Sequence, residues 1–271
     1  MFTHDDLRAF LACTGAYAVV RIVEAKGSTP RERGTIMLVS PTEILGSVGG
    51  GRLEFVAIAR ARELLAQGGA PVTLAIPLGP EISQCCGGHV TLQIASATPD
   101  TTATLLAEAA HADATAPSVY IFGAGHIGIA LSSILAITPV RVALIDTRDD
   151  VFAGVPARVD IHQSALPEQI VREAAPGAAF VIVTHDHSLD FLIAAEALRR
   201  TDATYVGMIG SRTKRQTFKT WFLKEAGGDI PTYERLVSPI GRGVVQDKRP
   251  AVIAALVAAE VLTALDGAGR T

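Results

Sequence analysis

The chain has 271 residues and a net charge of −3; 49% of the residues are hydrophobic and 25 are glycines. A chain of this length can bury two domain-sized cores, and its scattered lysines and arginines form no basic stripe that would neutralise a nucleic acid. The apolar runs end before the roughly 18 to 20 residues that a membrane span requires, and residues 1–10 lack the basic and then apolar pattern of a secretion signal. We therefore expect a cytoplasmic protein that uses neither nucleic acid nor membrane as a partner.

The first part of the chain predicts an α+β domain at residues 1–97. Residues 52–68 have the apolar spacing of a helix, and short apolar runs typical of strands surround them. These runs are residues 16–25, 35–40, 71–76 and 90–95. Strands and helix in separate blocks indicate a sheet with helices packed on it.

Two loops of this domain carry groups that favour anions. Residues 26–34 lie between two predicted strands and supply two hydroxyl and two guanidinium groups, those of Ser28, Thr29, Arg31 and Arg33. Gly49, Gly50 and Gly51 come at the start of the predicted helix, where free backbone amides attract phosphate. The alternative is that the glycines only permit tight turns and the arginines lie in solvent.

The composition changes between residues 96 and 118, where the chain is small and polar with prolines at both ends. We place a linker at 98–117, with a helix in its central part, about residues 102–112. From residue 118 to residue 271, buried-strand runs alternate with helical stretches, which predicts parallel strands joined by crossover helices. The fold class is thus α/β, with an N-terminal α+β domain followed by a Rossmann-like doubly wound parallel sheet domain.

The first strand of the second domain ends in a glycine-rich turn. Gly123, Gly125 and Gly128 have the G-x-G-x-x-G spacing between a strand and a helix, which lets a pyrophosphate approach the backbone. Asp146 ends the next strand, where a carboxylate can bind a ribose hydroxyl and favour NAD, while Arg148 keeps NADP open. The alternative is a Rossmann fold that keeps the turn for packing and binds no nucleotide.

Polar side chains also follow a later strand of this domain. Residues 181–190, VIVTHDHSLD, place His185 and His187 at the carboxyl end of a predicted strand, where doubly wound sheets bind their ligands. His185 is a candidate for acid–base work or for contact with a cofactor, and a structural zinc site would need a second pair of ligands. The alternative is that the segment only begins a helix, with Ser188 as its N-cap.

Seven motifs occur in an order that resembles the XdhC/CoxI family: GSTPRERG, GSVGGGRLE, QCCGG, IFGAGHIG, THDHSLD, GMIGSRTKR and SPIG. The likeness covers nearly the whole chain, and the combination is far more specific than any one motif. It implies a protein that binds the molybdenum cofactor, a pterin with a dithiolene and a terminal phosphate. Such a protein protects the cofactor while a cysteine desulfurase replaces an oxo ligand with sulfur, and then delivers it to apo-xanthine dehydrogenase.

Under this resemblance, the adjacent cysteines Cys85 and Cys86 are candidate ligands of molybdenum, since a thiolate suits a soft metal centre. Gly87 would leave room for a planar pterin, and Gln84 would hydrogen-bond its edge. The alternative is that both cysteines are inert small side chains in a core. The candidate cofactor-binding residues are Ser28, Thr29, Arg31, Gly49, Gly50, Gly51, Gln84, Cys85, Cys86, Gly87, Gly123, Gly125, His126, Gly128, Asp146 and His185.

Three functions remain open from the sequence. The first is a cofactor chaperone and sulfuration platform without turnover of its own, which the resemblance favours. The second is an NAD(P)-dependent oxidoreductase with His185 as general base, and the third is a redox or metal sensor that uses the vicinal thiols. We also expect a homodimer, formed through helices of the second domain such as residues 251–265.

Overall fold

The computed structural model describes residues 2–78, 87–241 and 247–268. The chain divides into two compact units, Met1–Thr115 and Ala116–Thr271. Each unit has its own sheet and its own hydrophobic cores. The candidate residues Gln84, Cys85 and Cys86 lie outside the described residues.

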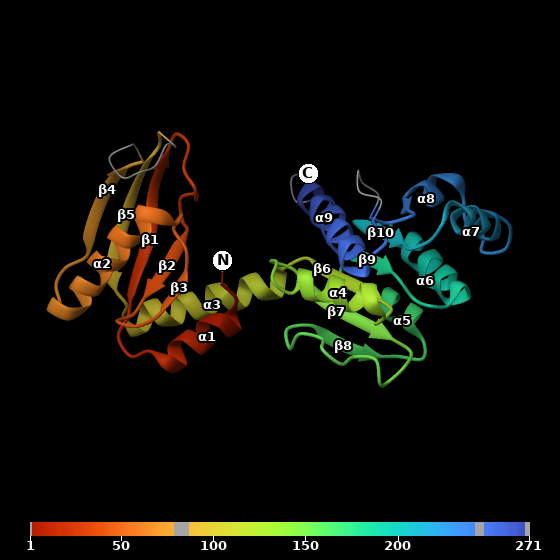
Figure 1. Cartoon of the computed structure of the whole chain (residues 1–271), viewed down its shortest axis with the longest axis horizontal. Helices are drawn as coiled ribbons and strands as arrows, with labels where there is room; N and C mark the ends of the chain where they lie inside the picture. The colour runs from red at the N-terminus through yellow and green to blue at the C-terminus, as the bar shows by residue number, and fades with distance from the viewer. Residues whose placement is uncertain (1, 79–86, 242–246, 269–271) are drawn as a thin grey trace. The chain divides into compact units, whose positions relative to one another are not determined.

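The first unit is built on an antiparallel sheet with the strand order β3-β2-β1-β5-β4. Its strands are β1 (Ala18–Lys26), β2 (Ile36–Val39), β3 (Ile44–Gly46), β4 (Val72–Pro77) and β5 (His89–Ser96). Its helices are α1 (His4–Cys13), α2 (Gly51–Gln67) and α3 (Pro99–Thr115). Successive side chains of β1 point to opposite faces, so Val20 packs in a core with Leu53 of α2, and Val19 packs in another with Leu7 of α1. Figure 1 shows α2 on one face of this sheet and α1 on the other.

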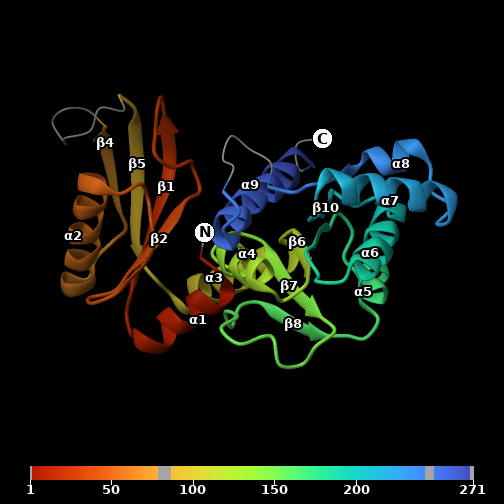
Figure 2. The same cartoon turned by 45° about the vertical axis from the view of Figure 1, so that its right-hand side comes forward.

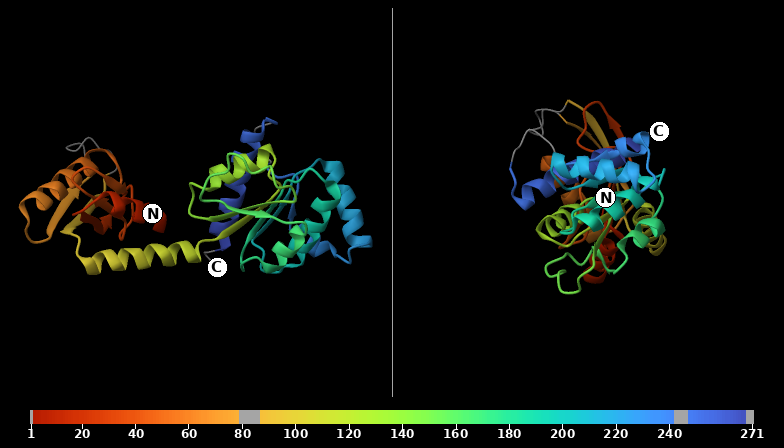
Figure 3. Two further views of the ribbon diagram at one scale, coloured as in Figure 1. Left: turned by 90° about the horizontal axis from the view of Figure 1, so that it is seen from below. Right: turned by 90° about the vertical axis from the view of Figure 1, so that its right-hand side faces the viewer.

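The segment expected as a linker forms helix α3, which packs within the first unit. Leu105 and Ala109 share a core with Phe10 of α1, and the His4 amide donates to the Asp113 carboxylate at 2.8 Å. Figure 3 shows α3 as one uninterrupted helix. The boundary between the two units therefore follows this helix, between residues 115 and 116.

The second unit contains a parallel sheet of six strands in the order β11-β10-β9-β6-β7-β8. The strands are β6 (Ser118–Phe122), β7 (Arg141–Asp146), β8 (Asp160–Gln163), β9 (Ala179–Ile182), β10 (Tyr205–Met208) and β11 (Leu236–Val237). The helices are α4 (His126–Leu135), α5 (Pro167–Glu173), α6 (His187–Arg199), α7 (Arg212–Lys224), α8 (Ile230–Glu234) and α9 (Pro250–Ala268). The prediction of an α+β domain followed by a doubly wound parallel sheet is confirmed.

Helices cover both faces of the parallel sheet (Figure 2). Helices α4 and α9 pack together and share a core with Val119 and Ile121 of β6. Helices α5, α6 and α7 contribute to the core on the other face, with Phe122 and Phe180. The direction in which strands are added reverses between β6 and β9, and doubly wound sheets bind ligands at the carboxyl ends of the strands beside such a point.

Helix α9 is, within the described residues, the one helix whose length and composition would allow it to cross a membrane. Core helices of water-soluble domains have the same character. The side chains of Ala254, Val257, Ala258 and Val261 belong to the core that α9 shares with α4. Packing in the second unit therefore accounts for one side of this apolar helix.

A buried ion pair joins the segments that follow β9 and β10. Asp190 of α6 is fully buried and the Lys214 side chain of α7 is 7% exposed, and the ammonium donates to the carboxylate. The other carboxylate oxygen accepts from the Thr184 amide at 3.1 Å and from the Thr184 hydroxyl at 2.6 Å. Burial raises the pKa of Asp190, and the Lys214 ammonium opposes this rise. The pair thus ties α6, α7 and the segment after β9 together at the carboxyl end of the sheet.

Removing one member of this ion pair should destabilise the second unit far more than replacing both members with apolar side chains. Asp190→Ala or Lys214→Ala leaves a buried charge without its partner and should lower the unfolding free energy by about 3 to 5 kcal/mol, whereas the double change to Leu and Met should cost less than either. Urea unfolding followed by fluorescence measures this in the second unit, because the chain's single tryptophan is Trp221. Arg249→Ala, which removes a side chain that is 79% exposed, is the control and should cost under about 1 kcal/mol. Equal losses for all variants would contradict the prediction.

Candidate functional site

In the first unit, the loop after β1 and the start of β5 pack against each other. A side chain at Gly88 would have its Cβ 2.2 Å from the carbonyl oxygen of Ser28, closer than any real contact. Lys26 and His89 pair across the two strands immediately beside this point. Only glycine fits at position 88, so the chain just before β5 packs directly against the loop that carries Ser28 and Thr29.

The glycine-rich turn before α2 joins the same cluster of loops. Gly49 has a φ of +136°, and a Cβ there would lie 2.4 Å from Cγ of Pro30. The loop of residues 26–34 is therefore packed against Gly49 through Pro30 and against Gly88 through Ser28. The structure thus brings together three motifs that the sequence places up to about 60 residues apart.

Leu78 and Gly87, the described residues on either side of 79–86, are hydrogen-bonded at this cluster. The Leu78 amide donates to the Gly88 carbonyl at 2.8 Å, and the Gly87 amide donates to the Leu78 carbonyl at 2.9 Å. Cys85 and Cys86 themselves lie outside the described residues. Gly88, which follows Cys86 by two positions in the sequence, is the nearest described residue shown to pack against Ser28.

The backbone amides of the glycine-rich turn already have an anionic acceptor. One carboxylate oxygen of Glu54 accepts from the Ser47 hydroxyl at 2.6 Å, from the Val48 amide at 3.0 Å and from the Gly49 amide at 3.3 Å. Burial raises the pKa of Glu54, but these hydrogen bonds outweigh it and lower the pKa below its usual range. A phosphate at this turn, as expected from the sequence, would meet a carboxylate that already accepts from the Val48 and Gly49 amides.

Two arginines line a cavity of about 430 Å³ in the first unit. Arg31 was predicted as an anion-binding residue, whereas Arg21 was missed. A single charge inside the apolar run of β1 is normally a solvent-facing residue, and the sequence alone does not show that Arg21 lies over a cavity. The other lining residues include Phe2, Ile36, Ser47 and Glu108.

In the second unit, the three glycines of the turn after β6 have three different surroundings. A Cβ at Gly123 would lie 2.5 Å from the Val183 carbonyl oxygen, and one at Gly128 would lie 1.8 Å from the Gly123 carbonyl oxygen. A Cβ at Gly125 would meet nothing within 4 Å. Gly125 is the N-cap of α4, and His126, the first residue of that helix, is exposed. Packing alone therefore accounts for Gly123 and Gly128, and only Gly125 faces open space.

Asp146 is engaged by the chain itself. Its carboxylate accepts from the Ala124 amide at 2.7 Å, from the Arg148 amide at 3.0 Å, and from the Arg148 guanidinium through two hydrogen bonds of 3.0 Å. Burial raises the pKa of Asp146, but the hydrogen bonds from Arg148 and Ala124 prevail and lower the pKa to about 2. A ribose hydroxyl would have to displace Arg148 to reach this carboxylate.

A small cavity lies at the carboxyl ends of the strands. The cavity there has a volume of about 10 Å³, enough for no more than a water molecule, and its lining includes Gly123, Asp146 and His185. His185 is exposed. Asp186 is the N-cap of α6 and accepts from the Ser188 amide at 2.7 Å, so the assignment of that role to Ser188 was wrong. Within the described part of the chain, no three His, Cys, Asp or Glu side chains are placed to hold a metal.

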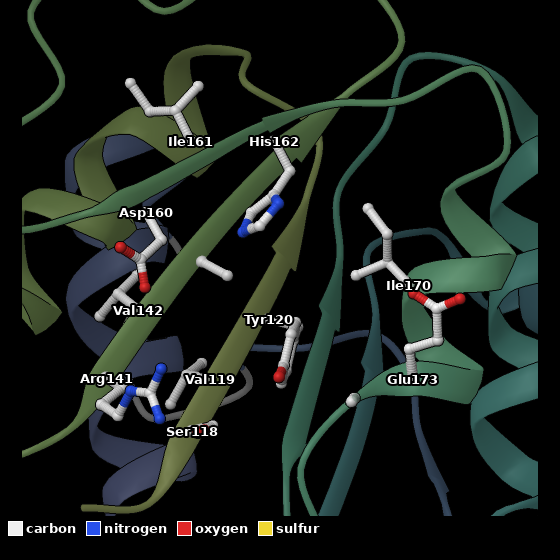
Figure 4. Close-up of a pocket in the computed structure, with 12 residues that line it drawn as sticks. Ser118, Val119, Tyr120, Arg141, Val142, Asp160, Ile161, His162, Ile170 and Glu173 are labelled. Carbon is white, nitrogen blue, oxygen red and sulfur yellow. The ribbon is translucent and has the colours of Figure 1, made fainter. Parts of the chain in front are cut away.

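A larger cavity of the second unit, about 420 Å³, lies at the other end of the sheet. Its lining includes Ser118, Arg141 and Asp160, the first residues of β6, β7 and β8. Figure 4 shows His162 of β8 and Tyr120 of β6 on the side of the sheet that faces α5. This cavity is therefore at the amino ends of the strands, away from the glycine-rich turn.

Together, an α+β unit and a doubly wound unit with a glycine-rich first turn define a two-domain α/β protein. Residues 119–261 match the family model described as the XdhC Rossmann domain, and residues 11–75 match the model described as the XdhC and CoxI family. The chain belongs to the XdhC and CoxI family, as predicted from its motifs.

Two known proteins illustrate this relationship. The chain is 23% identical over 253 residues to the uncharacterized protein YqeB of Escherichia coli strain K12. That match covers 91% of this chain and 43% of YqeB, so the chain spans less than half the length of this curated relative. A crystal structure from Bacillus halodurans, described as a xanthine dehydrogenase, has a similar fold, with a TM-score of 0.81 at 16% identity over 98% of this chain and 96% of that one.

The glycines of the turn after β6 should differ in their tolerance of alanine. Gly128→Ala forces a Cβ against the Gly123 carbonyl and should lower the unfolding free energy of the second unit by about 2 kcal/mol or more. Gly125→Ala places its methyl group in open space and should cost under about 1 kcal/mol. Urea unfolding of both variants decides, and the opposite ranking would show that the described packing is wrong.

The Asp146 interactions should make stability depend on pH in acid. The folded-state pKa of about 2 lies below the ordinary 3.8, so the stabilisation is complete above about pH 4 and is lost as the pH falls towards 2. The wild type should therefore exceed Asp146→Asn in unfolding free energy by a constant amount above about pH 4, and this difference should shrink below it. Urea unfolding at several pH values measures the difference, and one that stays unchanged down to pH 2 would contradict the assignment.

Proposed function

We propose that this protein holds the molybdenum cofactor while a cysteine desulfurase sulfurates it, and then delivers it to apo-xanthine dehydrogenase. Membership of the XdhC and CoxI family supports a role in the maturation of xanthine dehydrogenase. The observation that carries the proposal is the packing of Gly88 and Gly49 against the loop of residues 26–34. It brings the polar and basic loop, the glycine-rich turn before α2 and Gly88, which follows Cys86 by two positions in the sequence, together at one end of one sheet.

This arrangement suits a ligand with one soft and one anionic end. Molybdenum bound to a dithiolene is a soft centre, which a thiolate from Cys85 or Cys86 can bind. The terminal phosphate of the cofactor needs cationic groups, and Arg31 belongs to the loop against which Gly88 packs. The three loops thus offer both kinds of group to one elongated molecule.

The oxidoreductase considered from the sequence has less support. Asp146 is bound by Arg148 and Ala124, and the cavity that Gly123, Asp146 and His185 line has a volume of only about 10 Å³. A dinucleotide whose ribose binds Asp146 would have to displace Arg148. We therefore assign the ligand to the first unit and treat the second unit as a folded support for it.

The chaperone function is tested by reconstitution. Apo-xanthine dehydrogenase, a cysteine desulfurase with cysteine, and isolated molybdenum cofactor are mixed with and without this protein, and xanthine oxidation is measured. We expect activity to appear at least about tenfold faster with the protein, because a labile cofactor passed directly between proteins is not lost to water. Equal activation without the protein, at the same cofactor and sulfide supply, would refute the proposal.

The thiol role makes a separate prediction. Replacing Cys85 and Cys86 together by Ala should lower cofactor retention after gel filtration by about tenfold or more, because the metal loses its soft protein ligand. Cys13, which is exposed at the end of α1, provides the control. Cys13→Ala should retain cofactor like the wild type, and full retention by the double variant would show that the thiols do not bind molybdenum.

A further inference from the structure

The cavity of about 430 Å³ in the first unit combines cationic and apolar lining. Arg21 enters it from β1, and Arg31 enters it from the loop that follows. Phe2, which is buried, and Ile36 supply apolar surface. A concave space with a few polar groups on an apolar surface is the usual form of a small-molecule site.

Arg21 occupies an unusual place on the sheet. It follows Val19 on the same face of β1, because side chains alternate along a strand. Val19 is covered by the core that α1 and α3 share, whereas Arg21, two residues further on, is only half-buried and lines the cavity. Arg21 therefore lies just beyond the part of this sheet face that α1 and α3 cover, where the cavity begins.

Neither arginine is neutralised by hydrogen bonds within the described residues. Both Arg21 and Arg31 lack a hydrogen-bond or ion-pair acceptor among residues 2–78, 87–241 and 247–268. This contrasts with Arg148, whose guanidinium holds Asp146 through two hydrogen bonds. Arg21 is half-buried, whereas Arg31 is exposed at the rim of the cavity. A half-buried guanidinium such as that of Arg21, without an acceptor, favours an anion from outside the chain, and the planar fork of either arginine matches phosphate oxygens.

The glycine-rich turn before α2 supports an anion site at the two arginines. Its amides at Val48 and Gly49 are already bound to Glu54, so they do not provide free donors for a phosphate. The cavity also contains one opposing charge, the exposed carboxylate of Glu108. Two cations and one anion leave the lining with a net positive charge.

We infer that this cavity binds the phosphate monoester end of the ligand of the first unit, with Arg21 and Arg31 as its two guanidinium groups. The identity of that ligand as the molybdenum cofactor rests on the proposed function, whereas the anion site itself rests on the cavity. Arg21 is thereby a binding residue, and Glu108 weakens the site by its charge.

Binding of inorganic phosphate by the full chain, measured by calorimetry, tests the site. Arg21→Gln and Arg31→Gln should each weaken binding by about tenfold, the usual effect of losing a charge-assisted hydrogen bond. Arg33→Gln is the matched control, because Arg33 lies two residues from Arg31 and does not line the cavity. It should change the affinity less than about twofold, and Glu108→Gln should tighten binding.

Equal effects of Arg31→Gln and Arg33→Gln, or unchanged binding by Arg21→Gln, would overturn the inference. Arg21→Lys guards against misfolding, because it keeps the charge and should bind phosphate better than Arg21→Gln. The same variants are then tested with isolated molybdenum cofactor. Normal cofactor retention by Arg21→Gln would refute the inference and leave the proposed function standing. If no form of the chain retains cofactor while phosphate binding follows the arginines, the function fails and the anion site stands.

Discussion

The arrangement of the first unit depends on a backbone contact that only glycine permits. With no side chain at position 88, β5 begins directly against the carbonyl of Ser28. Gly49 likewise leaves no room for a side chain, because its backbone packs against the ring of Pro30 in the same loop. Because these contacts join backbone to backbone or to a rigid ring, they fix the spacing of the loops more firmly than flexible side chains would. The site proposed for the cofactor exists only because these three segments are held at one end of one sheet.

Both units contain a glycine-rich turn whose amides are bound by a carboxylate of the chain. Glu54 does this before α2, and Asp146 does it after β6 through the Ala124 amide. Such turns attract anions because their donors are free, and here an internal anion already satisfies several of them. The glycine spacing therefore indicates the local fold of each turn more reliably than it indicates a bound phosphate. This competition explains why we place the ligand's phosphate at arginines instead of at either turn.

The sequence predicted the parts of this protein that depend on local pattern. Apolar spacing at residues 52–68 located α2, and alternating strand and helix signals gave the doubly wound sheet. It missed β8 because all four residues of that strand are exposed, so no apolar run marks it. It also missed that Arg21 lines a cavity and that Glu54 accepts hydrogen bonds from the turn before α2. The exposure of β8, the position of Arg21 and the hydrogen-bond partners of Glu54 all depend on tertiary packing, which a local sequence pattern does not contain.

The central claim is that this chain itself binds the molybdenum cofactor in its first unit. The most direct measurement is the molybdenum content and the ultraviolet-visible spectrum of the full-length protein after incubation with isolated cofactor and removal of the unbound fraction. The account predicts about one molybdenum atom per chain, with a spectrum that reports a thiolate-bound metal. Protein that emerges with no molybdenum, under conditions in which the cofactor stays intact, would contradict it.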